Sequence, residues 1–118
     1  MNTIEELLSE AREARDRFWF VQSLTEVERT ASTITVHLII GPELYVQAYL
    51  SELSSRLSFA LVDTSGRLYG RNRERGTWHR HPFDDPDRHE PTPEGMSPRP
   101  LLQFMAEVEE ILLENELI

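Results

Sequence analysis

Cysteine and lysine are both absent from this chain, and no apolar run approaches the length that a membrane-spanning helix needs. Without cysteine there is no disulfide framework, no thiolate metal site and no cysteine nucleophile. The N-terminal residues also lack the basic and apolar regions of a secretory signal. These absences predict a soluble, cytoplasmic protein without a membrane-spanning segment.

Net charge divides the chain into two unequal parts. Twenty-one acidic residues against twelve arginines give −9 over 118 residues, which argues against a surface built throughout to coat nucleic acid. Residues 67–81 nevertheless hold five arginines and one glutamate, so this window carries +4 and the remainder, with seven arginines and twenty acids, carries −13. Every cation in the window is an arginine, whose planar fork of donors suits phosphate.

The length and the apolar periodicity predict a single α+β domain. Helical spacing after a capping box predicts a helix over about residues 3–16. Alternation with a period of two, joined by short connections, predicts an antiparallel meander of four to five strands over about residues 18–71. Residues 72–97 contain many prolines and are expected to form an irregular loop with basic and histidine side chains. A second helix is expected over about residues 98–116, so that an N-terminal and a C-terminal helix flank the sheet.

The face of this sheet that the helices leave uncovered is a candidate binding surface. If the hairpin registers stay in phase, it carries polar and aromatic side chains of a kind that can stack bases. The alternative is the ordinary solvated face of an antiparallel sheet. The residues that would share it are His37, Tyr45, Gln47, Tyr49, Arg67, Tyr69 and Arg71.

Two histidines lie two residues apart inside the basic window, in the stretch Trp78-His-Arg-His-Pro-Phe83. In an extended chain His79 and His81 point to the same side, where imidazoles could accept and donate protons during phosphodiester cleavage. The alternative is a metal site completed by His89 or Glu90. No His-Glu-x-x-His helix and no cysteine pair supports that alternative, so we predict no metal and no other cofactor. Trp78 is expected to anchor the segment on the core.

Three motifs carry a resemblance to a known family: Tyr69-Gly-Arg71, the block Trp78–Phe83 and the string Pro86-Asp-Arg-His-Glu90. With them, most of the chain resembles the TumE-type toxins, small proteins of prokaryotic toxin–antitoxin systems. That family commonly has an aspartate directly after the Gly-Arg step. Asn72 stands there in this chain, which argues against a carboxylate-dependent mechanism at that position.

The resemblance implies a growth-inhibiting toxin that a neighbouring antitoxin, usually a helix-turn-helix protein, neutralises. Many small toxins are ribonucleases built from helices on an antiparallel sheet, so by analogy of fold we predict metal-independent RNA cleavage. His79 and His81 would form the acid–base pair, and Tyr69 would stack on or orient the substrate. The predicted phosphate contacts are Arg71, Arg73 and Arg80.

The alternative class is a non-enzymatic interaction module. It would use the uncovered sheet face, or the acidic last helix, to hold a partner or a second copy of the chain. The basic segment would then be a docking surface.

Overall fold

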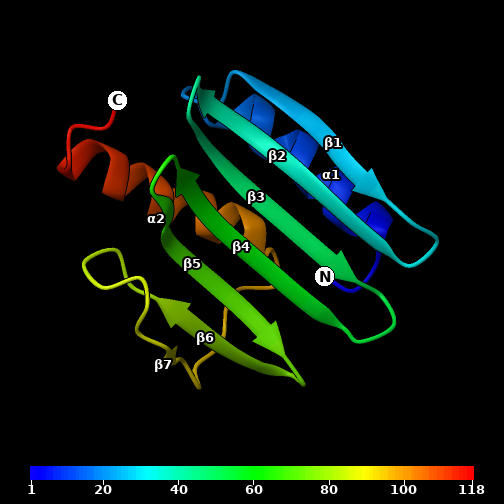
Figure 1. Cartoon of the computed structure of the whole chain (residues 1–118). Helices are drawn as coiled ribbons and strands as arrows, with labels where there is room; N and C mark the ends of the chain where they lie inside the picture. The colour runs from blue at the N-terminus through cyan, green and yellow to red at the C-terminus, as the bar shows by residue number, and fades with distance from the viewer.

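Seven strands follow one another along the chain and pair only with their sequence neighbours in the computed structural model, which describes residues 1–118 (Figure 1). Every pair is antiparallel, so the strands form one open meander. One helix precedes the sheet and one follows it. The bounds are α1 Ile4–Arg17, β1 Ser23–Arg29, β2 Thr33–Gly41, β3 Leu44–Ser51, β4 Arg56–Asp63, β5 Gly66–Glu74, β6 Thr77–His81, β7 Glu90–Pro91 and α2 Pro100–Glu114.

The α+β class, the antiparallel sheet and the two helices are confirmed, but the prediction of four to five strands is wrong, because the sheet has seven. Most of the difference lies in the segment expected to be irregular. β5 continues to Glu74, and the chain reverses through Arg75 and Gly76, both of which have positive φ, into β6. Polar side chains occupy both faces of this hairpin, so no apolar alternation marks it, although its backbone hydrogen bonds need none.

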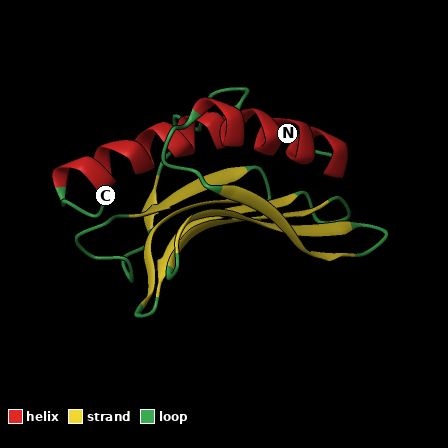
Figure 2. Ribbon diagram, turned by 90° about the horizontal axis from the view of Figure 1, so that it is seen from above, coloured by secondary structure: helices red, strands yellow, loops and turns green.

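Both helices pack on the same face of the sheet (Figure 2). One hydrophobic cluster lies between the two layers and includes fully buried side chains such as Leu7 of α1, Phe59 of β4 and Phe104 of α2. Neither helix combines the length and the apolar character that crossing a bilayer requires. No helix covers the other face of the sheet, which we call the uncovered face (Figure 2).

Glu10 of α1 joins the two helices. Its buried carboxylate accepts hydrogen bonds from the backbone N–H groups of Leu101 and Leu102, in the first turn of α2. The N-cap residue Arg99 makes no side-chain capping bond, so α1 supplies the cap that α2 lacks. Burial raises the pKa of Glu10, although these hydrogen bonds to its carboxylate act in the opposite direction.

A β-bulge in β5 changes the direction of its later side chains. Arg67 pairs with Val62, whose side chain lies on the uncovered face, whereas Tyr69 pairs with Leu61 in the core. Because side chains alternate along a strand, the one extra residue turns Tyr69 and Arg71 toward the helices. The expectation that these two share the uncovered face is therefore wrong. The residues that do lie there are His37, Tyr45, Gln47, Tyr49 and Arg67.

Candidate functional site

The residues predicted to form one site lie on opposite faces of the sheet. In β6, His79 pairs with Asn72 and His81 pairs with Gly70, all on the uncovered face. Arg80, between the two histidines, points to the helix side and pairs there with Arg71. Tyr69 and Arg73 also face the helix side. The backbone of the sheet thus separates the predicted acid–base pair from all its predicted substrate contacts.

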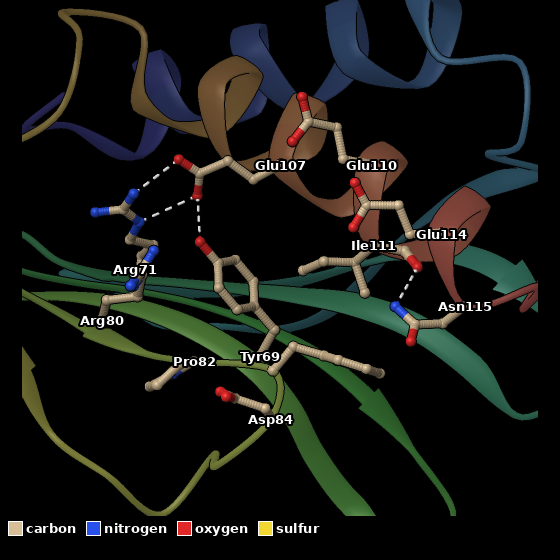
Figure 3. A pocket seen from close by; sticks show the side chains of 11 residues that line it. Tyr69, Arg71, Arg80, Pro82, Asp84, Glu107, Glu110, Ile111, Glu114 and Asn115 are labelled. Atoms are coloured by element: carbon tan, nitrogen blue, oxygen red, sulfur yellow. Dashed lines mark hydrogen bonds and ion pairs between the residues drawn. The ribbon is translucent and has the colours of Figure 1, made fainter.

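Tyr69 and Arg71 form a network with Glu107 of α2 (Figure 3). Arg71 donates from Nε and Nη2 to the two carboxylate oxygens, at 3.1 and 2.8 Å. The Tyr69 hydroxyl donates to the same carboxylate at 2.6 Å. Burial, together with this hydrogen bond, raises the pKa of Tyr69 to about 12. Burial disfavours the charged form of Arg71, but the Glu107 carboxylate outweighs this effect and raises the pKa of Arg71. The guanidinium fork predicted to bind phosphate holds α2 to β5 instead.

The other two predicted phosphate contacts also have partners within the protein. Arg73 donates to the backbone carbonyls of Ser55 and Met1, at 3.1 and 2.9 Å. Arg80 forms an ion pair with Glu90. These arginines therefore tie β5 and β6 to neighbouring segments of the chain.

A cleft of about 590 Å³ lies between α2 and the strands β5 and β6 (Figure 3). Tyr69, Arg71 and Arg80 line it, so the structure does bring three of the predicted residues together. Four carboxylates share its lining with these two arginines, so its charge disfavours an anionic substrate. The four are Asp84, Glu107, Glu110 and Glu114.

Three histidines gather on the uncovered face, and we call them the histidine cluster: His79, His81 and His89. The ring of His89 lies 4.0 Å from that of His79 and 5.2 Å from that of His81, measured between centroids. His89 comes from the segment between β6 and β7, and sequence reasoning weighed it only as a metal ligand. No group of three His, Cys, Asp or Glu side chains in the structure has an arrangement that could hold a metal ion.

The neighbours of His81 define its tautomer. Its Nδ1 lies 3.1 Å from the carbonyl oxygen of Pro86, which can only accept, so we assign the ring proton to Nδ1. Nε2 then presents its lone pair to the Asn72 amide nitrogen at 3.2 Å. The Ser58 hydroxyl donates to the Asn72 carbonyl oxygen at 3.0 Å and orients that amide. Burial is the main cause that lowers the pKa of His81, and the charge of Arg67 is the second. The ring is therefore neutral at neutral pH.

Arg67 is the cation beside this cluster, and Gly70 gives it room. The exposed Arg67 side chain donates from Nη2 to the Pro86 carbonyl at 3.1 Å, the acceptor that His81 also uses. A Cβ atom on Gly70 would lie 3.1 Å from Cδ of Arg67 and 3.2 Å from the backbone oxygen of Phe59. Sequence reasoning did not select Arg67 as a site residue, because its proximity to His81 depends on the bulge in β5.

Replacing Gly70 with alanine is expected to displace Arg67 and raise the pKa of His81 part of the way toward its ordinary value. The reason is that a positive charge opposing protonation would move away, while burial would remain. Arg67→Gln should shift the titration in the same direction without crowding the backbone. NMR titration of the histidine rings measures both effects, and Arg12→Gln on α1 is the matched control. An unmoved His81 titration in both test variants would contradict the role of Arg67.

The motif blocks that carry the toxin resemblance supply much of this arrangement. They contain His79, His81 and His89, as well as Pro86, whose carbonyl accepts from His81. Trp78 packs against the core next to Phe59, with ring centroids 6.2 Å apart, which confirms its expected anchoring role. The structure therefore brings the histidines of the motif blocks together on the uncovered face, whereas Tyr69, Arg71 and Trp78 of the same blocks face the helices.

The protein is thus an open antiparallel sheet that carries both helices on one face and the histidine cluster on the other. No protein-family model, curated protein or solved structure matches the chain. The resemblance to TumE-type toxins rests on the motifs alone.

Proposed function

We propose that this protein is the toxin-like component of a toxin–antitoxin system and that it cleaves RNA at the histidine cluster without a metal. The observation that carries the proposal is the convergence of the motif histidines, beside an exposed arginine, on one face of the sheet. The helix-turn-helix antitoxin implied by the resemblance is the proposed partner.

In the proposed reaction His81 is the general base and His79 the general acid. A substrate 2′-hydroxyl replaces the Asn72 amide at Nε2 of His81 and gives up its proton there. The 2′-oxygen attacks phosphorus and forms a cyclic phosphate, while the bond from phosphorus to the 5′-oxygen breaks. Protonated His79 donates its proton to that leaving oxygen, and Arg67 stabilises the charge on the phosphate oxygens. Arg67 here takes the role that the sequence suggested for Arg71, Arg73 and Arg80.

Induction of the protein in a bacterial host, with and without the neighbouring reading frame, tests the proposal. Growth and bulk RNA are followed together after induction. We expect arrest with loss of RNA when the protein is alone, and recovery when the neighbour is co-expressed. Growth without arrest would contradict the toxin assignment, and arrest with intact RNA would contradict the nuclease assignment.

Purified protein separates the metal-independent reaction from its alternatives. Cleavage of a labelled RNA is expected to persist in a chelator, because the mechanism uses only imidazole and guanidinium groups. Loss of cleavage on chelation would show that a metal is required. Intact RNA, combined with co-elution of the neighbouring gene product, would favour the non-enzymatic interaction module.

A further inference from the structure

We infer that the substrate is single-stranded RNA that crosses the strands of the uncovered face, from the histidine cluster to a base stacked on Tyr49. This inference rests on the proposed function and names the class of substrate for the same site. Three features support it: the distribution of charge, the register of the strands and the free ring of Tyr49.

Acidic side chains are concentrated on the helix side of the molecule. The sequences of α1 and α2 together contain nine acidic residues and three arginines. On the uncovered face of the sheet, the register places two acidic and two basic side chains besides the histidines, so the two signs balance there: Glu28, Arg56, Arg67 and Glu74. The uncovered face is therefore the side on which a phosphate backbone meets the least repulsion.

Strand register connects the histidine cluster to Tyr49 in one row. Tyr49 pairs with Ser58, Ser58 with Asn72, and Asn72 with His79, across β3, β4, β5 and β6. Because neighbouring strands lie about 4.8 Å apart, Tyr49 stands roughly 14 Å from His79. The two residues between them in this row, Ser58 and Asn72, have short side chains, and in the next row the Arg67 side chain lies beside Gly70. A few nucleotides of an extended strand can span this distance with little obstruction from side chains.

Tyr49 has the ring that a base could use. Tyr45 stacks on His37 with ring centroids 4.2 Å apart, and His37 is hydrogen-bonded to Gln47 at 2.9 Å. Tyr49 is half-buried, and its neighbours on the two adjacent strands, Thr35 and Ser58, have no ring that could stack on it. Unpaired bases stack on aromatic side chains of exposed sheets, whereas the bases of a duplex are already stacked on one another. The free ring therefore favours a single strand over a duplex.

Binding of a short, fluorescently labelled RNA with 2′-O-methyl groups, which cannot be cleaved by this mechanism, tests the inference by anisotropy. Tyr49→Leu should weaken binding about tenfold, the loss of one base–aromatic stack. Tyr49→Phe should bind like the wild type, because the ring remains. Trp19→Leu, which removes an aromatic side chain that is 69% exposed beyond the end of α1, is the matched control and should not change binding.

The outcomes separate this inference from the proposed function. If the wild type binds the methylated RNA through Tyr49 but leaves unmodified RNA intact, the nuclease proposal fails and the binding surface stands. If unmodified RNA is cleaved while Tyr49→Leu binds as tightly as the wild type, only the inference is overturned. Equal binding of duplex and single strand would also overturn it. So would a Tyr49-dependent complex with the neighbouring gene product in the absence of any RNA binding.

Discussion

Growth arrest is expected to disappear when His79→Gln and His81→Asn are combined, while the protein still accumulates in folded form. Removing a general acid or a general base typically costs about 10²- to 10⁴-fold in rate, and the combination removes both. Asparagine at position 81 retains an N–H group that can donate to the Pro86 carbonyl, so the loop keeps its contact. Growth after induction and the rate of RNA cleavage by purified protein measure the effect.

His37→Gln is the matched control for this experiment. His37 lies on the same uncovered face but outside the histidine cluster, where it contacts Gln47 and Tyr45. The control should therefore arrest growth like the wild type. Undiminished arrest by the combined variant, at equal protein levels, would rule out His79 and His81 as the acid–base pair.

The pH profile of cleavage is a second test of His81 as the general base. Burial and Arg67 lower its pKa below the ordinary 6.5. A general base must be unprotonated to act, so the acid limb of the kcat/KM profile should have its midpoint below that value. Arg67→Gln should move this midpoint upward, because the repulsive charge is then absent.

Arg71→Met is expected to lower the free energy of unfolding by about 3 kcal/mol, since it leaves the Glu107 carboxylate without its cation in a largely buried network. For a domain of this size the melting temperature should fall by roughly 10 °C. Arg71→Met combined with Glu107→Gln should recover much of the loss, because no unpaired charge remains and the amide oxygen still accepts from Tyr69.

Arg88→Gln is the matched control, because it removes an arginine whose ion pair is exposed. Arg88 is exposed and pairs with Glu90 near the surface, so its removal should change stability by less than about 1 kcal/mol. Thermal and denaturant unfolding measure all three proteins. An Arg71→Met variant as stable as the wild type but unable to cleave RNA would contradict the structural role of Arg71 and indicate that it binds the substrate.

Apolar periodicity predicted the helices and the central strands because burial on one side leaves a repeating pattern in the sequence. β2 shows this most clearly, with alternate residues buried along its whole length. β6 has no such pattern, since histidines lie on one side and Trp78 and Arg80 on the other. Pairing of its backbone with β5 and β7 makes it a strand, and that pairing leaves no apolar signature.

The candidate site, like the fold, was predictable from the sequence only in part. That His79 and His81 share one side follows from their spacing in an extended chain, because alternation is a local property of the backbone. The absence of lysine and cysteine likewise limits the available chemistry whatever the fold. The cation that lies beside the two histidines depends on the register of β5. One extra residue there places Arg71 against Glu107 and leaves Arg67 beside His81. His89 reaches them only because the chain folds back after Pro86. Residue types and local spacing were thus readable in the chain, whereas the choice of face was not, because a single-residue bulge reverses it.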